Sequence, residues 1–178
     1  MAQKIIVLDR DGVINHDSDA FIKSPDEWLP VEGSIEAIKR LKKAGWIVAV
    51  ATNQSGIKRG YYSRQTLSQM HQKFVGLLGG MQLDWISYSP YLSEDNSPSR
   101  KPGTGMLQAI EQRFDCSLIN APMVGDTLAD IEVALAKSMQ PYLVKTGKGE
   151  RTLASGDQRL QNIPVYEDLY AVVEALLA

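Results

Sequence analysis

The amino-acid sequence predicts an α/β fold: a three-layer, Rossmann-like parallel sheet with helices on both faces. Short apolar runs, typical of strands buried on both faces, alternate with segments whose apolar residues recur at helical spacing. Polar residues follow several of these runs directly, where an α/β sheet binds its ligands. The 178 residues fit one domain, which we expect to span residues 1–178 with no large cap domain.

The first half of the chain contains two predicted strands and two predicted helices. The run Ile5–Leu8 is the first strand, and a polar connection leads from it to Ser34, a predicted N-cap. The helix that starts there is closed by Gly45. Residues 46–51 form the second strand, and a long amphipathic helix starts near Ser63.

The second half continues the alternation, which predicts right-handed crossovers and a parallel sheet. Its predicted elements are a strand at 83–89, a loop at 90–102, a helix around 107–114, a strand at 121–124, a helix at 128–136, a strand at 142–144, a glycine-bearing loop at 145–149, a short strand near 165 and a helix at 168–177.

Composition excludes several classes of function. Hydrophobic residues make up 44% of the chain and charged residues 22%, which is typical of a globular protein with a core. A net charge of −2 without a basic run argues against nucleic acid or an anionic membrane as a partner. No signal-peptide pattern is visible, and the single Cys116 excludes an internal disulfide. We therefore expect a cytoplasmic monomer.

Two acids, Asp9 and Asp11, follow the first predicted strand. Taken alone, they fit either a solvated acidic turn or a site where a cation offsets buried carboxylates. The other strand ends favour a site, because parallel strands bring their carboxyl ends to one edge. The polar residues at these ends are Thr52 and Asn53 after the second strand, Arg100 and Lys101 after the third, and Asp126 after the fourth.

These residue types suit the hydrolysis of a phosphate monoester. Asp9, Asp11 and Asp126 offer the oxygen ligands that Mg²⁺ prefers. A carboxylate such as Asp9 can attack phosphorus, while Asp11 protonates the leaving oxygen and later deprotonates water. The Thr52 hydroxyl and the Lys101 charge can stabilise the phosphoryl group, and the Arg100 guanidinium can bind the substrate.

Four segments in this order resemble the motifs of the haloacid dehalogenase-like phosphatases. They are D-R-D-G-V-I-N at 9–15, T-N-Q-S-G at 52–56, R-K-P at 100–102 and G-D-T-L-A-D at 125–130. Longer stretches, including A-T-N-Q-S-G-I-x-R-G-Y and R-K-P-x-x-G-M, resemble the D-glycero-D-manno-heptose 1,7-bisphosphate 7-phosphatases and, more distantly, histidinol-phosphatase domains. The resemblance implies magnesium-dependent removal of the 7-phosphate during heptose synthesis for lipopolysaccharide or related glycans.

The resemblance also implies a role for individual residues. Asp9 resembles the nucleophile, Asp11 the proton donor, Thr52 and Lys101 the phosphoryl-stabilising residues, and Arg100 the substrate-recognition arginine. The implied magnesium ligands are Asp9, the backbone carbonyl of Asp11, and Asp126. The other implied substrate contacts are Asp17, Ala20, Asn53, Gln54, Ser55 and Thr127.

The chain departs from this family in one loop. Many relatives bind zinc just before the Arg-Lys pair, but residues 89–100 contain no Cys or His, so no structural zinc is expected. Asp130 is expected to orient the metal ligands, and His71 to be a surface or packing residue. The alternative functions are a histidinol-phosphate or other small-molecule phosphatase, and a non-catalytic protein that binds a phosphorylated ligand.

Overall fold

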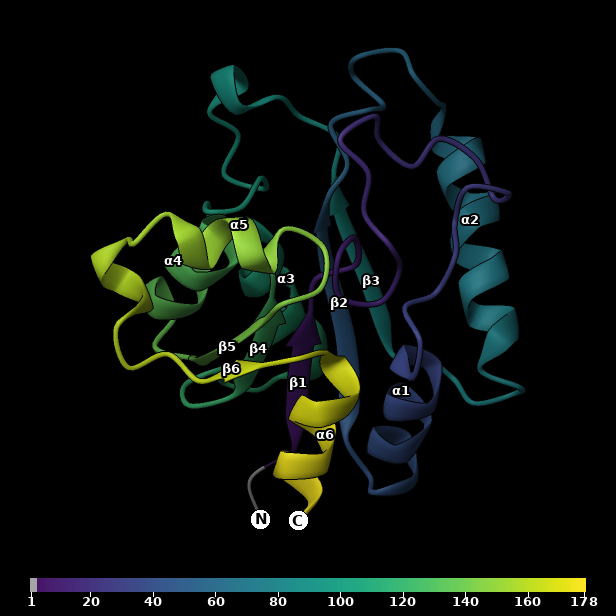
Figure 1. Cartoon of the computed structure of the whole chain (residues 1–178). Helices are drawn as coiled ribbons and strands as arrows, with labels where there is room; N and C mark the ends of the chain where they lie inside the picture. Colours follow the sequence, from purple (N-terminus) through teal and green to yellow (C-terminus); the bar gives the residue numbers. More distant parts are fainter. Residues whose placement is uncertain (1–2) are drawn as a thin grey trace.

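The computed structural model describes residues 3–178 and contains one six-stranded sheet (Figure 1). Its strand order is β3-β2-β1-β4-β5-β6, and every neighbouring pair is parallel. The strands are β1 (Ile5–Leu8), β2 (Ile47–Asn53), β3 (Trp85–Ser89), β4 (Pro122–Gly125), β5 (Gln140–Val144) and β6 (Val165–Tyr166). The chain reverses direction across the sheet between β1 and β4, which is the switch point where such sheets bind ligands.

Helices cover both faces of this sheet, as predicted. They are α1 (Ser34–Lys43), α2 (Arg64–Leu77), α3 (Gly105–Phe114), α4 (Leu128–Ala136), α5 (Gly149–Ala154) and α6 (Leu169–Leu177). Ile6 and Leu8 of β1 pack in one core with residues of α1, α2 and α6, whereas Ile5 and Val7 pack in a second core with residues of α3 and α4. The side chains of a strand alternate between faces, so β1 is buried by both layers.

Several local predictions differ from the structure. Thr52 and Asn53, expected after the second strand, belong to β2. The N-cap of α1 is Gly33, with a φ of 80°, and the Ser34 hydroxyl instead donates a hydrogen bond to the carbonyl of Ile14 at 2.7 Å. β3 starts at Trp85 rather than at residue 83, since the Asp84 side chain accepts from the backbone N–H of Val48 (2.8 Å). The short helix α5 was not predicted, because its six residues are too few to show a helical period.

The connections beyond the strands' carboxyl ends position the site. Between β1 and α1, residues 9–33 form only isolated bridges, at Asp11 with Asn15 and at Asn15 with Pro30. The long 90–104 connection contains only one short 3-10 turn, Ser93–Asp95. Among residues 3–178, no helix is both long enough and apolar enough to cross a membrane.

Candidate active site

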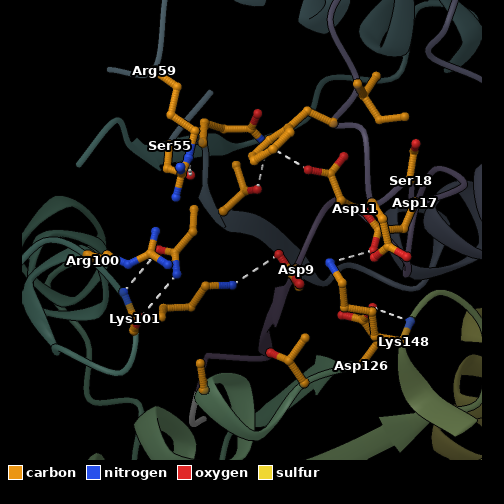
Figure 2. A pocket seen from close by; sticks show the side chains of 18 of the residues that line it. Asp9, Asp11, Asp17, Ser18, Ser55, Arg59, Arg100, Lys101, Asp126 and Lys148 are labelled. Atoms are coloured by element: carbon orange, nitrogen blue, oxygen red, sulfur yellow. Dashed lines mark hydrogen bonds and ion pairs between the residues drawn. The ribbon is translucent and has the colours of Figure 1, made fainter. Parts of the chain in front are cut away.

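A pocket of about 400 Å³ opens at the carboxyl end of the sheet, beyond β1, β2 and β4 (Figure 2). Its lining comes from residues far apart in the sequence. They are Asp9, Asp11, Asp17, Ser18, Asp19, Phe21, Ile22, Thr52, Asn53, Gln54, Ser55, Arg59, Tyr62, Arg100, Lys101, Asp126, Thr127, Ala129 and Lys148. The predicted convergence of polar residues on one edge of the sheet is confirmed.

Asp9 lies at the floor of this pocket, directly after β1, and is 8% exposed. Its Oδ1 accepts hydrogen bonds from the Lys101 ammonium at 3.0 Å and from the backbone N–H of Arg10 at 2.8 Å. Among residues 3–178, no hydrogen bond is donated to its Oδ2. The carboxylate is thus fixed through Oδ1, and Oδ2 remains free to react.

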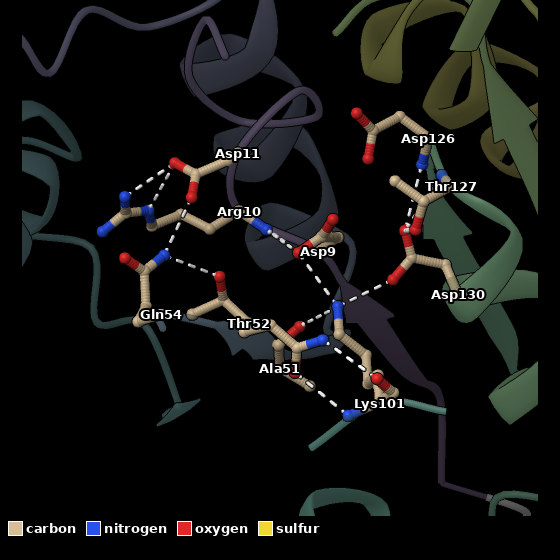
Figure 3. Close-up of polar contacts among 11 residues, drawn as sticks. Asp9, Arg10, Asp11, Ala51, Thr52, Gln54, Lys101, Asp126, Thr127 and Asp130 are labelled. Carbon is tan, nitrogen blue, oxygen red and sulfur yellow. Dashed lines mark hydrogen bonds and ion pairs between the residues drawn. The ribbon is translucent and has the colours of Figure 1, made fainter. Parts of the chain in front are cut away.

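Lys101 is buried between three acceptors (Figure 3). Its Nζ donates to Asp9 Oδ1 (3.0 Å), to Asp130 Oδ1 (2.7 Å) and to the carbonyl of Ala51 (2.7 Å). Burial alone would lower the pKa of Lys101, but the two carboxylates raise it above its usual value. The Asn53 amide fixes the backbone of Lys101 through both its N–H and its carbonyl, at 3.0 Å each.

Asp11 is surrounded by hydrogen-bond donors. Its Oδ1 accepts from Arg10 Nε (3.1 Å), from Arg10 Nη2 (2.6 Å) and from Asn15 Nδ2 (2.8 Å), while its Oδ2 accepts from Gln54 Nε2 (2.8 Å). Burial alone would raise the pKa of Asp11, but the Arg10 guanidinium and these donors lower it below its usual value. These donors hold the Asp11 side chain in one orientation.

Thr52 is the penultimate residue of β2, close to Asp11, and is 1% exposed. Its Oγ1 accepts a hydrogen bond from the same Gln54 nitrogen at 2.9 Å. Because Thr52 Oγ1 accepts this bond, its hydroxyl proton remains available for another acceptor at the pocket.

Asp126 follows β4 and is 1% exposed. Its Oδ2 accepts from the backbone N–H of Lys148 at 2.9 Å, whereas its Oδ1 is buried without a hydrogen-bond partner. Gly12 and Gly147 allow this close packing, since a Cβ at either position would lie within 2.4 Å of Asp126 Oδ2. Burial and then the Asp130 carboxylate raise the pKa of Asp126 to about 7.

The acids fit a hard divalent cation. Oxygens of Asp9, Asp126 and Asp130 lie within 4.8 Å of one another, and burial and the Asp130 charge raise the pKa of Asp9 as well. Both oxygens of Asp130 already accept hydrogen bonds. Oδ1 accepts from Lys101, and Oδ2 accepts from the backbone N–H and the hydroxyl of Thr127. The unpartnered Asp126 Oδ1 and the neighbouring Asp9 carboxylate therefore offer oxygen ligands of the kind that Mg²⁺ prefers. The contacts of Asp130 match the supporting role predicted for it.

Cationic side chains line two opposite sides of the pocket (Figure 2). Arg59 and Arg100 lie on one side, and neither forms an ion pair within residues 3–178. On the other side, Lys148 pairs with Asp17, with Nζ 2.8 Å from Oδ2. Burial first, and then the neighbouring Arg59 charge, lower the pKa of Arg100 below its usual value.

All but one of the predicted site residues line this pocket. Ala20 is the exception, since it is exposed and outside the lining. Thr127 donates to Asp130, and both amide ends of Gln54 are bonded within the protein. Their roles as substrate contacts stay predictions.

Several residues of the site were not singled out in the sequence, among them Lys148, Arg10 and Tyr62. Lys148 lies in the 145–149 loop, whose spacing does not match a phosphate loop. Arg10 is fully buried, and its Nη1 lies 3.2 Å from Nε2 of His71, which is half-buried and agrees with the packing role predicted for it. Tyr62 lines the pocket. The sequence held two signals for these residues: Arg10 lies between two acids, and the 145–149 loop directly follows a predicted strand.

Comparison with known proteins identifies this arrangement. The family model described as polynucleotide kinase 3 phosphatase matches residues 4–140. Curated proteins named D-glycero-beta-D-manno-heptose-1,7-bisphosphate 7-phosphatase are similar over nearly the whole chain. The one from Pseudomonas putida is 48% identical over 98% of this chain and 99% of its own, and the one from Bordetella bronchiseptica is 46% identical over 98% of both.

Solved structures agree with the sequence relatives. D,D-heptose 1,7-bisphosphate phosphatase from B. bronchiseptica, complexed with magnesium and phosphate, superimposes with a TM-score of 0.94 at 46% identity, covering 98% of each chain. The enzyme of that name from Burkholderia thailandensis gives 0.75 at 38% identity, covering 99% of each chain. The chain has the haloacid dehalogenase-like fold and is a phosphoric monoester hydrolase. It belongs to the D-glycero-D-manno-heptose 1,7-bisphosphate 7-phosphatase family.

Proposed function

We propose that this chain removes the 7-phosphate of D-glycero-D-manno-heptose 1,7-bisphosphate in a magnesium-dependent reaction with an aspartyl-phosphate intermediate. The observation that carries the proposal is the Asp9 carboxylate, fixed through Oδ1 by Lys101 and with Oδ2 free of hydrogen bonds within residues 3–178. The product would serve the synthesis of activated heptose for lipopolysaccharide or related glycans.

In the first step, Asp9 Oδ2 attacks phosphorus and the bond from phosphorus to the C7 oxygen breaks. Asp11 gives its proton to that leaving oxygen. In the second step, water attacks phosphorus, the bond to Asp9 Oδ2 breaks, and Asp11 takes a proton from the water. Asp11 is then protonated for the next cycle, so the proton count balances.

Other groups act on the phosphoryl oxygens. The Lys101 ammonium restrains Asp9 and supplies a fixed positive charge beside the reacting group. The free hydroxyl proton of Thr52 is available to a phosphoryl oxygen. Asp9, Asp126 and the backbone carbonyl of Asp11 would hold a magnesium ion, which would neutralise charge on the phosphoryl oxygens.

Arg59 and Arg100 favour a substrate with a second anionic group. Both lie on the pocket side away from Asp126, and within residues 3–178 neither forms an ion pair, although the charges of Glu94 and Asp95 act to raise the pKa of Arg100. Guanidinium groups without a paired carboxylate match a phosphate in charge and shape. They also disfavour histidinol phosphate, because its ammonium group would meet two like charges.

We further propose that the protein works as a cytoplasmic monomer on a small sugar phosphate, with neither nucleic acid nor membrane as a partner. The pocket of about 400 Å³ suits a ligand of that size. A net charge of −2 disfavours the polynucleotide substrate that the family model's description suggests.

A substrate panel tests this proposal. Phosphate release is measured with magnesium and equal concentrations of both anomers of the heptose 1,7-bisphosphate, heptose 7-phosphate and histidinol phosphate. We expect the highest kcat/KM with one of the bisphosphate anomers. A higher kcat/KM with histidinol phosphate would overturn the assigned substrate, and no release from any of them would support a non-catalytic, ligand-binding protein.

A further inference from the structure

The two oxygens of Asp11 have very different surroundings (Figure 3). Oδ1 accepts three hydrogen bonds, two from Arg10 and one from Asn15. Oδ2 accepts one, from Gln54 Nε2 at 2.8 Å. The more weakly occupied oxygen is the one able to exchange a proton with substrate and water, so the Gln54 amide lies beside the reactive atom.

The Gln54 amide is useful to Asp11 in only one orientation. After Asp11 has given up its proton, its carboxylate only accepts hydrogen bonds, so the NH₂ end of Gln54 must face it. That end also donates to Thr52 Oγ1 at 2.9 Å. If the amide turned over, its carbonyl oxygen would face the Asp11 carboxylate and the bond to Asp11 Oδ2 would be lost.

Tyr62 holds the amide in that orientation. Its hydroxyl donates to Gln54 Oε1 at 2.5 Å, and the residue is 9% exposed. Burial raises the pKa of Tyr62 to about 12, so the hydroxyl keeps its proton and remains a donor. A donor at Oε1 assigns the NH₂ group to the opposite end, toward Asp11 and Thr52.

The turn after β2 places Tyr62 beside Gln54. Residues 55–61 fold back on themselves, with the N–H of Arg59 bonded to the carbonyl of Ser55 and the N–H of Tyr61 bonded to that of Gly56. A Cβ at Gly56 would lie 2.3 Å from the Tyr62 ring, so the ring packs against a position that only glycine fits. The tyrosine is thus fixed by packing as well as by its hydrogen bond.

From these contacts we propose that Tyr62 is a positioning residue for the acid–base group Asp11, acting through the Gln54 amide. The inference rests on the proposed function, because it needs Asp11 to move the proton. It gives the pocket-lining Tyr62 a role that requires no contact between its hydroxyl and the substrate.

The Tyr62→Phe variant tests this role, since it keeps the ring and removes the hydroxyl. The value of kcat/KM reports on steps up to departure of the leaving group. A sugar alkoxide needs a proton from Asp11, but p-nitrophenolate leaves without one. We expect Tyr62→Phe to lower kcat/KM for the sugar bisphosphate about tenfold and to change it less than about twofold for p-nitrophenyl phosphate. A general distortion of the site would lower both values equally.

A double-mutant cycle tests whether the effect passes through Gln54. Gln54→Leu should lower kcat/KM for the sugar bisphosphate at least as much as Tyr62→Phe, and the double variant should match Gln54→Leu alone. Effects that multiply would instead mean that Tyr62 acts directly on the substrate, which would overturn the proposal. Tyr61→Phe is the matched control, because Tyr61 is 52% exposed and outside the pocket lining, and it should behave as wild type.

Failure of the inference is distinguishable from failure of the proposed function. If wild-type protein releases phosphate from the sugar bisphosphate and Tyr62→Phe does so with an unchanged kcat/KM, only the role of Tyr62 is wrong. If wild-type protein hydrolyses none of these substrates, the proposed function itself is wrong.

Discussion

The Lys101 ammonium and the Asp9 carboxylate form a buried ion pair, with Nζ 3.0 Å from Oδ1. The same ammonium lies 2.7 Å from Asp130 Oδ1, so one cation balances two carboxylates of the site. Breaking such a pair leaves uncompensated charge in a medium of low dielectric constant. Lys101 therefore contributes both to the stability of the fold and to the position of the nucleophile.

Replacing Lys101 should affect both properties. We expect Lys101→Met to lower kcat about 100- to 1,000-fold, because a fixed charge beside the phosphoryl group is lost. We also expect it to reduce the free energy of unfolding by about 3–5 kcal/mol. Steady-state kinetics and denaturant unfolding measure the two effects. Lys145→Met is the matched control, since its pair with Glu167 is exposed, and it should change neither. A folded Lys101→Met with wild-type kcat would contradict this role.

The Asp126 carboxyl should couple metal binding to pH. Its pKa is about 7 in the folded protein, against 3.8 ordinarily, so between these values the folded state holds a proton that the unfolded state has lost. This group's contribution to the stability of the metal-free protein therefore falls as pH rises through that range. Because magnesium binding must displace the proton, the increase in Tm on adding magnesium should be small at about pH 5 and larger at about pH 8.

Thermal unfolding with EDTA or with MgCl₂ at both pH values measures this coupling. Asp126→Asn removes the titrating group, so the variant should be more stable than wild type without metal near neutral pH. It should also respond little to magnesium. An equal magnesium-induced shift at both pH values, or a full shift in the variant, would show that Asp126 is not a ligand.

Arg59 should distinguish a bisphosphate from a monophosphate. Its guanidinium lines the pocket, with Cζ 5.5 Å from the centre of the Phe21 ring, and has no acid partner within residues 3–178. We expect Arg59→Ala to raise KM for the heptose bisphosphate about tenfold and to leave KM for heptose 7-phosphate nearly unchanged. Arg113→Ala, a change at a guanidinium over Trp85, is the control. Equal effects on both substrates would argue against a second phosphate at Arg59.

The loop at residues 90–102 should need no metal. It contains no Cys or His. An ion pair stabilises it, with Lys58 Nζ 2.6 Å from Asp95 Oδ1. The Lys58 ammonium also lies 5.8 Å from the centre of the Tyr91 ring. Elemental analysis of purified protein should find far less than one zinc per chain. One tightly bound zinc per chain would refute this prediction.

Much of the fold was readable from the sequence because β1 is apolar at every position and its neighbours alternate with amphipathic helices. The convergence of Asp9, Thr52, Lys101 and Asp126 followed from the same reasoning, since parallel strands place their ends together. These predictions require only the spacing of the apolar residues along the sequence and the parallel direction of the strands.

The supporting contacts could not be predicted in this way. Tyr62 reaches Gln54 through a turn whose shape depends on glycine conformations, and His71 reaches Arg10 from the middle of α2. Lys148 lines the pocket because the 145–149 loop packs against Gly12. These contacts depend on tertiary packing, and no local spacing encodes them. Ala20 was expected to contact the substrate, but it is exposed and outside the pocket lining. Its position also depends on tertiary packing that no local spacing encodes.

The most direct test of the account concerns Asp9. Phosphate release from heptose 1,7-bisphosphate is measured with magnesium for wild type and for Asp9→Asn, with circular dichroism to confirm that both are folded. The amide cannot serve as the attacking carboxylate, so we expect Asp9→Asn to lose at least about 10,000-fold in kcat. Folded Asp9→Asn that releases phosphate at the wild-type rate would contradict the covalent mechanism.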